Sequence, residues 1–386
     1  MPFCNISDTG VEAKIFYRTY GAGPIKVLLI IGLAGTHDSW APQILALTGS
    51  DAPCDDDNES APVDRRPHEG LDGIQACAYD NRGMGQSYTP TNKSHYSTTI
   101  MAKDAIALMD HLGWRKAHVF GHSMGGMIAC KLASMVPNRI LSLALLNVTG
   151  GGFECFPKLD RKTISIAIRF LMAKTPEQRA AVDLDTHYTE EYLEQCVGLK
   201  TRREILYQKY VEGITGAGMQ STYGFDGQVY ACWTHKMTSR DIESIRSTGF
   251  LISIIHGRYD VIAQIYHARR LAKKLQPYAR MIELNGGHLV SHERTDEVNQ
   301  ALVDLIKASE SNISPHDWTN FHMESSDRIS RTTVSDAGDE HSVIVYMLGK
   351  LHVGLLYLFS LFMLMLGYAR TAFKSLKPAK VEAVLT

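Results

Sequence analysis

A serine framed by glycines stands between an apolar stretch and a predicted helix. Residues 117–122 are mostly apolar, and Ser123 follows within Gly121-His-Ser-Met-Gly125, ahead of a helix that we expect to begin near Met127. Glycine lacks a Cβ and so permits a sharp strand-to-helix turn in which chain segments approach closely. Such a turn projects the serine hydroxyl above the carboxyl ends of the strands, where ligands bind in open α/β sheets. Ser123 is therefore the candidate nucleophile.

A serine hydroxyl needs a base to accept its proton and an acid to orient that base. The predicted strand after the serine helix ends at Asn147 without a carboxylate, whereas the next strand end supplies Asp260. The last predicted strand ends in a glycine pair before His288, which leaves room for a projecting imidazole. The order Ser123, Asp260, His288 predicts a triad in which His288 acts first as general base and then as general acid.

Other histidines lie near the same predicted elements. His256 precedes a turn, His267 lies in a predicted helix, and His292 stands ahead of the final helix, where we expect it to be exposed. Histidines in such positions more often have a structural role or lie on the surface than take part in catalysis. His122 should point away from the Ser123 side chain, and we assign it a structural role too.

The tetrahedral intermediate of acyl transfer needs two N–H donors. Met124 directly follows the nucleophile and offers its backbone N–H by geometry. Leu33 lies in the glycine-rich turn of residues 32–35, directly after a predicted buried strand, and is the best second donor. We therefore predict an oxyanion hole formed by the main chain of Leu33 and Met124.

The elements that must hold these residues alternate between strands and helices. Apolar, β-branched runs predict strands buried on both faces, and apolar residues at spacings of three and four predict helices. This alternation predicts an α/β fold with a mostly parallel central sheet and helices on both faces. Residues 11–21 alternate loosely and predict an edge strand. The other strands are predicted at residues 25–31, 73–79, 117–122, 140–148, 250–255 and 280–284, and helices at 97–113, 263–275 and 295–308.

One long interruption breaks the alternation. Residues 151–247 are helix-prone and amphipathic without a clear buried strand. We expect them to form a helical cap over the carboxyl edge of the sheet, where a cap can wall a pocket. The core then consists of residues 1–150 and 248–309. Residues 49–72, rich in Asp, Pro, Ser and Glu, are expected to form a solvated loop.

Composition argues against several classes of protein. A chain of 386 residues with 45% hydrophobic content can bury a full core, and its formal net charge of −1 gives no reason to expect nucleic-acid binding. Seven cysteines without a Cys-x-x-Cys pair argue against a disulfide framework or a zinc site. We expect neither a metal nor a cofactor, and the sequence leaves the oligomeric state open.

An apolar segment near the C-terminus predicts a membrane contact. Residues 351–369 contain no formally charged side chain, and as a helix they would span about 28 Å, close to the ~30 Å hydrocarbon thickness of a bilayer. A helix packed on the domain would keep a polar face, which this segment lacks. We expect a transmembrane anchor and basic tail in residues 343–386, joined to the core by a flexible linker in residues 310–342.

Two sequence features predict opposite orientations for this anchor. The N-terminus lacks the basic and apolar regions of a signal peptide, so we expect a cytosolic core and a single-pass anchor inserted after synthesis. The basic end favours the opposite orientation under the positive-inside rule, and a re-entrant helix that also uses residues 343–346 would reconcile the two. The basic residues after the segment are Arg370, Lys374, Lys377 and Lys380.

Five motifs resemble those of α/β-hydrolases of the enol-lactonase, carboxylesterase and epoxide-hydrolase-like branch. Together they span residues 11–309 in the family's order and spacing, so the resemblance implies the same fold and triad. It also implies that Asp80 and Arg82 brace the loop beneath the site, and that Gly121 and Gly125 shape the serine turn. The motifs lie at residues 31–35, 80–87, 121–125, 256–260 and 287–288.

Two positions depart from the family pattern. Ile31 stands where many members have a histidine, which leaves open what supports the Leu33 turn. Ser123 stands where epoxide hydrolases and haloalkane dehalogenases have an aspartate nucleophile, and this disfavours their reactions.

The sequence therefore predicts a membrane-anchored serine hydrolase that cleaves a carboxylic ester, lactone or thioester through an acyl-enzyme. Its expected substrate is a small, lipophilic acyl compound. An acyltransferase would use the same triad with an alcohol in place of water, and a ligand receptor of this fold would signal through cap movement. An intact triad favours catalysis over the receptor.

Overall fold

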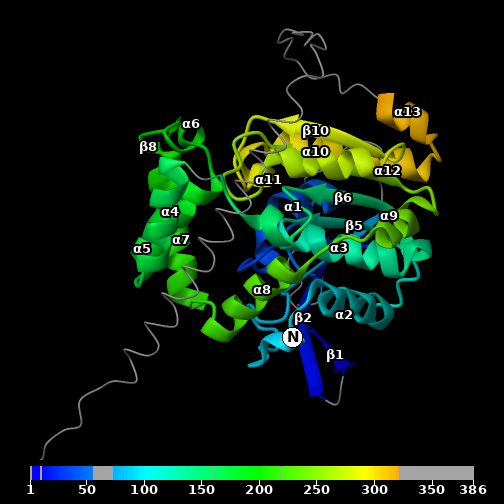
Figure 1. Ribbon diagram of the computed structural model, residues 1–386, viewed down its shortest axis with the longest axis horizontal. Coiled ribbons are helices and arrows are strands. Elements are labelled where there is room, and N and C mark those ends of the chain that lie inside the picture. The colour runs from blue at the N-terminus through cyan, green and yellow to red at the C-terminus, as the bar shows by residue number, and fades with distance from the viewer. Residues whose placement is uncertain (1, 9–10, 55–72, 159, 218, 321–386) are drawn as a thin grey trace, which may run out of the picture. The chain divides into compact units, whose positions relative to one another are not determined.

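Six parallel strands, with an antiparallel pair along one edge, form the central sheet (Figure 1). The computed structural model describes residues 2–8, 11–54, 73–158, 160–217 and 219–320. Strand order is β1-β2-β4-β3-β5-β6-β9-β10, in which β1 and β2 run antiparallel to their neighbours. The bounds are β1 Phe3–Asp8, β2 Val11–Tyr20, β3 Ile25–Ile30, β4 Ile74–Tyr79, β5 Ala117–His122, β6 Ile140–Leu146, β9 Leu251–Gly257 and β10 Ala279–Leu284.

Helices cover both faces of this sheet (Figure 1). Their bounds are α1 Ala41–Thr48, α2 Thr98–His111, α3 Met124–Met135, α9 Ser239–Arg246, α10 Ile265–Lys274, α11 Val290–Glu293 and α12 Thr295–Glu310. α3 packs beside α2 and α9, while α1 packs beside α12. Every residue of β5 and β9 is buried, as expected for strands enclosed by two helical layers. The predicted α/β class with a mostly parallel sheet is confirmed.

Two local predictions were wrong. The strand over residues 11–20 is not at the edge, because β1 pairs along its outer side with Cys4 opposite Ile15. The polar Asn5 and Ser7 hide β1 in the sequence. The helix after the serine begins at Met124 rather than near Met127, since the following glycines adopt helical conformations despite their low intrinsic propensity.

Between β6 and β9 the chain forms the helical cap. α4, α5 and α7 make a lobe beside the sheet (Figure 1), whereas α9 packs on α3, where Ile245 enters the main core. The bounds are α4 Arg161–Met172, α5 Pro176–His187, α6 Glu190–Leu193, α7 Arg202–Ala217 and α8 Thr222–Thr234, with the short strands β7 Cys196–Val197 and β8 Lys200–Thr201. Short 3-10 helices are η1 His37–Trp40, η2 Lys93–His95, η3 Pro137–Arg139 and η4 Gly152–Cys155.

A last short helix, α13 (Pro315–Asn320), lies within the predicted linker. Trp318 is fully buried, and its indole N–H donates to the backbone oxygen of Ile252 at 3.0 Å. The Arg280 guanidinium lies 5.0 Å from the centre of the indole ring. The prediction of a flexible linker was therefore wrong for residues 315–320, because the buried Trp318 side chain fixes this helix to the core.

Within the described residues, no helix is both long enough and apolar enough to cross a membrane. The predicted anchor and basic tail, residues 343–386, lie outside those residues, as does most of the predicted loop at 49–72.

Candidate active site

Ser123 occupies a strained turn between β5 and α3. Its φ of 54° and ψ of −121° lie in a region that residues with a Cβ rarely adopt. A Cβ at Gly121 would lie 2.4 Å from the Gly125 carbonyl oxygen, and one at Gly125 would lie 2.0 Å from that of Ile30. The serine N–H donates to Leu146 on the neighbouring strand at 2.8 Å. The turn therefore needs both glycines.

The structure brings Ser123, His288 and Asp260 together. His288 Nε2 lies 3.1 Å from Ser123 Oγ, and His288 Nδ1 lies 2.8 Å from Asp260 Oδ2. A carboxylate only accepts hydrogen bonds, so Nδ1 carries the proton and Nε2 accepts from the serine hydroxyl. This is the tautomer that a general base requires.

Asp260 is held as a buried carboxylate. Its Oδ1 accepts the backbone N–H groups of Ile262 and Ala263, both at 2.8 Å. Burial would raise the pKa of this carboxyl, but the charge and hydrogen bond of His288 lower it to about 2, with smaller contributions from His256 and Asn147. Asp260 is therefore ionised near neutral pH and can stabilise an imidazolium.

Asn147 is a site residue that the sequence reasoning missed. It sits at the end of β6 with a φ of 47°, and its Nδ2 donates to Asp260 Oδ2 at 2.7 Å and to the Gly287 carbonyl at 3.2 Å. One amide thus fixes both the acid and the loop that carries the base. Its place at the end of a predicted strand, at the edge where the triad residues also lie, is the sequence feature that could have identified Asn147.

His122 acts on the same loop. Its ring is buried, and burial, followed by the charge of His288, lowers its pKa to about 3. The neutral ring donates from Nε2 to the backbone oxygen of His288 at 2.9 Å. We predicted a structural role for His122, and its hydrogen bond holds the backbone of the loop that carries His288.

The other candidate histidines bond elsewhere. His292 is partly buried and donates from Nε2 to the Ser39 carbonyl at 2.8 Å, so its predicted exposure was wrong. His256 donates from Nε2 to the Ala263 carbonyl at 2.8 Å, beneath the acid. His267 lies 3.6 Å from Glu154. Among the residues that the structure describes, none of these three hydrogen bonds to the serine.

The predicted oxyanion turn lies against the nucleophile. A Cβ at Gly32 would lie 2.9 Å from the Cβ of Ser123, so Leu33 follows at close range. Met124 is the first residue of α3, and the first N–H groups of a helix have no partner within it. The two N–H groups remain our predicted donors.

Gln228 of the cap supports this turn. It is fully buried, and its Oε1 accepts from Ala34 N–H and from Gln220 Nε2, each at 3.0 Å. Its Nε2 donates to the Arg82 carbonyl at 3.0 Å. Ala34 has a φ of 61°, an unfavourable conformation for alanine. A cap glutamine therefore holds the loop for which Ile31 cannot provide a polar side chain.

The loop after β4 contacts the segment that follows this turn. Asp80 Oδ1 accepts from His37 N–H and faces His37 Nδ1, both at 2.9 Å. Arg82 donates to both oxygens of Asp104, at 2.6 and 2.5 Å. All four side chains are buried or nearly so. Within the described part of the chain, neither Asp80 nor Arg82 hydrogen bonds to Ser123, Asp260 or His288, and their bracing role stays a prediction.

The cap also contacts His288, the predicted general base. The His187 ring stacks on that of His288 with centroids 6.4 Å apart, and the Leu289 N–H donates to the His187 carbonyl at 2.9 Å. Burial, followed by the charge of His288, lowers the pKa of His187 to about 3. A neutral ring therefore lies against one side of the predicted general base.

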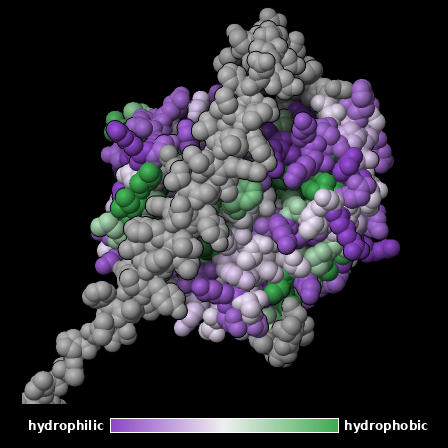
Figure 2. All heavy atoms as spheres, viewed as in Figure 1, coloured by the Kyte–Doolittle hydropathy of each residue, from purple (hydrophilic) through white to green (hydrophobic). Residues whose placement is uncertain are grey.

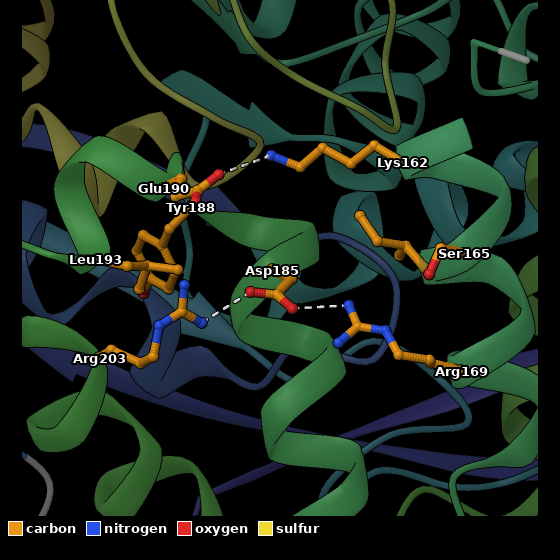
Figure 3. Close-up of a pocket in the computed structure, with 9 residues that line it drawn as sticks. Lys162, Ser165, Arg169, Asp185, Tyr188, Glu190, Leu193 and Arg203 are labelled. Atoms are coloured by element: carbon orange, nitrogen blue, oxygen red, sulfur yellow. Dashed lines mark hydrogen bonds and ion pairs between the residues drawn. The ribbon is translucent and has the colours of Figure 1, made fainter. Parts of the chain in front are cut away.

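A separate pocket of about 370 Å³ opens within the cap (Figure 3). Tyr188 lines it, and the backbone of this tyrosine passes 3.1 Å from where a Gly287 Cβ would lie. The pocket's cations are paired: Arg169 and Arg203 with Asp185, at 2.7 and 2.8 Å, and Lys162 with Glu190, at 3.9 Å. No cluster of three or more potential metal ligands occurs in the described parts of the chain.

Residues 26–295 match the alpha/beta hydrolase fold family, and the chain belongs to that family. The RutD protein of Azorhizobium caulinodans, named as a carbamate hydrolase, is 25% identical over 306 residues, which are 78% of this chain and 97% of RutD. The dihydrolipoyllysine-residue acetyltransferase component of the acetoin cleaving system of Pseudomonas putida is 26% identical over 303 residues, 78% of this chain and 68% of that protein.

Solved structures agree with this assignment. The enol-lactonase of Burkholderia xenovorans LB400 has a TM-score of 0.59 and 22% identity, with 79% of this chain and 100% of that chain covered. Likeness at this identity supports the fold alone. The resemblance that the motifs predicted is confirmed at the level of the family.

The contacts of Gln228 predict a catalytic effect of its removal. Gln228→Met keeps the side-chain volume but leaves Ala34 N–H without its acceptor. The turn of residues 32–35 should then lose its fixed position relative to Ser123. We expect kcat on an activated ester to fall about 10- to 100-fold, less than the loss of a whole oxyanion donor. Gln228→Glu retains the acceptor for Ala34 N–H but loses the donor to the Arg82 carbonyl, so it should recover only part of the rate. Gln220→Met is the matched control, and an unchanged kcat in Gln228→Met would contradict the positioning role.

Proposed function

We propose that the protein is a serine hydrolase that cleaves a carboxylic ester, lactone or thioester through an acyl-enzyme. The observation that carries this proposal is the unbroken hydrogen-bonded series from Ser123 through His288 to Asp260. Nothing in that series needs to rearrange before the hydroxyl proton moves to His288.

Acylation and deacylation use the same groups in turn. Ser123 Oγ bonds to the carbonyl carbon, its proton passes to His288 Nε2, and the N–H groups of Leu33 and Met124 receive the oxyanion. The intermediate then expels the alcohol or thiol, which takes the proton from His288. In a lactone this hydroxyl stays attached to the acyl chain. Water repeats the sequence, releases the acid and restores the serine.

We infer that the substrate is lipophilic and that the protein works at a membrane. Residues 351–369 carry no formal charge and are long enough to span a bilayer as a helix. A single-pass C-terminal anchor with the hydrolase domain in the cytosol would keep the triad next to lipid-soluble esters. The chemistry proposed for the triad uses no cofactor.

A fluorophosphonate probe tests the nucleophile. The probe should label the wild-type protein and fail to label Ser123→Ala, because the serine forms a covalent bond to phosphorus only when a base activates it. His288→Ala should slow labelling by orders of magnitude, on the order of 10³ or more. A folded wild-type protein that stays unlabelled would refute the hydrolase proposal.

Esters of graded acyl chain length test the substrate class. Long chains should be cleaved with higher kcat/KM than acetate esters. A labelled serine without acid release, but with acyl transfer to an added alcohol, would indicate an acyltransferase. Labelling without turnover of any ester would favour the receptor.

Removal of residues 343–386 tests the anchor. The full chain should sediment with membranes and stay there after a high-salt wash. The truncated chain should move into the soluble fraction in high salt. High salt is used because it screens ionic contacts and leaves burial of apolar side chains intact. A truncated chain that still sediments with membranes at high salt would show that the tail is not the main anchor.

A further inference from the structure

Residues 187–189 of the cap contact the loop that carries His288. The Leu289 N–H donates to the His187 carbonyl at 2.9 Å, and a Cβ at Gly287 would lie 2.7 Å from that same oxygen. The visible face of the cap lobe mixes hydrophobic and hydrophilic side chains (Figure 2), whereas this segment meets the loop through backbone atoms and directed hydrogen bonds. The approach is so close that only glycine fits at position 287.

One carboxylate joins the cap segment to the loop. Glu293 is the last residue of α11, and its Oε2 accepts the backbone N–H of Gly287 at 2.8 Å and that of Thr189 at 3.2 Å. Its Oε1 accepts from the Thr189 hydroxyl. These three donors are neutral, so the contacts depend on where the acceptor oxygens lie rather than on charge pairing.

Thr189 is itself fixed by the cap. It is the N-cap residue of α6, and its hydroxyl oxygen accepts the Tyr192 N–H at 3.3 Å. The Tyr192 hydroxyl in turn donates to the His292 carbonyl at 3.3 Å, so α6 reaches α11 at a second point. The position of the Glu293 carboxylate is therefore set from the cap as well as by α11.

The peptide group that Glu293 contacts lies directly before the general base. Asn147 and His122 donate to the carbonyls of Gly287 and His288, at 3.2 and 2.9 Å. Glu293 provides the complementary contact, because it accepts the Gly287 N–H. A displacement of about 1 Å at a catalytic group can cost about 100-fold in rate, so the contacts of this peptide group bear on catalysis.

We propose that Glu293 is a positioning residue for the general base, and that Thr189 of the cap sets the position of Glu293. The inference rests on the hydrolase function proposed above and extends it from the triad to the cap. Among the described residues, the Glu293 carboxylate has no hydrogen bond to Ser123 or to His288. It acts on the base through the Gly287 N–H, and a cap movement at Thr189 reaches the base by the same path.

Steady-state kinetics of the full-length protein on an activated ester test this role. Glu293→Met removes the acceptor at similar side-chain length, so kcat should fall about 10- to 100-fold with little change in KM. Glu293→Gln keeps an acceptor for both N–H groups and can donate to the Thr189 oxygen, so it should recover most of the rate. Glu297→Met is the matched control on α12, where Glu297 pairs with Arg294, and it should leave kcat unchanged.

A double-mutant cycle tests the contribution of the cap. Thr189→Val removes the hydroxyl with little change of shape, so kcat should fall about 2- to 10-fold, and Thr189→Ser should restore it. Because Thr189 acts through Glu293, the double variant should be no slower than Glu293→Met alone. Losses that multiply in the double variant would show two independent effects and would overturn the proposal.

Proton NMR of His288 gives a readout that needs no turnover. The His288 Nδ1 proton lies in the 2.8 Å hydrogen bond to Asp260, and its low-field resonance is assigned by its loss in His288→Ala. Glu293→Met should shift or broaden this resonance, whereas Glu293→Gln and Glu297→Met should preserve it. An unchanged resonance and kcat in folded Glu293→Met would overturn the proposal.

Melting temperatures establish that each variant is folded. If Glu293→Met does not fold, Thr189→Val must still lower kcat and shift the resonance, and an unaltered Thr189→Val protein would contradict the positioning role. A wild-type protein that shows the resonance but cleaves no ester would refute the hydrolase proposal alone. The resonance of the Glu293 variants would then decide the positioning role.

Discussion

Ser123 projects toward its base because the chain around it packs more closely than any Cβ would allow. Its backbone adopts a φ of 54°, and positions 121 and 125 each lie within 2.4 Å of a carbonyl oxygen when a Cβ is built there. Such strain persists only when surrounding contacts over-determine it. Here the parallel strands supply those contacts, since β5 lies between β3 and β6 and delivers the serine at their shared carboxyl edge. The rest of the site is arranged around this one turn.

Buried polar contacts complete the arrangement around this turn. Asp260 is removed from water, which would be costly for an unpaired carboxylate, but two backbone N–H groups, Asn147 and His288 satisfy it. The loop that bears His288 is fixed in turn by His122 and Asn147. The cap contributes as well, because Gln228 bonds to the oxyanion turn and His187 lies against the base. Core and cap therefore act on the same few atoms.

Much of this arrangement was predictable from the sequence, for identifiable reasons. Continuous apolar runs marked the parallel strands, and the motif order placed Ser123, Asp260 and His288 at neighbouring strand ends, where the structure brings them together. Asn147, Gln228 and His187 were not singled out as site residues, because their roles depend on partners more than 30 residues away in the chain and on no local pattern. β1 was hidden by alternating polar residues, and the burial of Trp318 in α13 left no periodic signal in six residues.

Identification of the covalent intermediate tests the central claim most directly. The full-length protein is mixed with an activated long-chain ester, quenched with acid during turnover, and digested for mass analysis. The account predicts that the peptide containing Ser123 gains the mass of the acyl group, and that Ser123→Ala shows neither this adduct nor ester cleavage above the uncatalysed rate. Ester cleavage that persists in Ser123→Ala, with no acylated peptide in the wild-type protein, would contradict it.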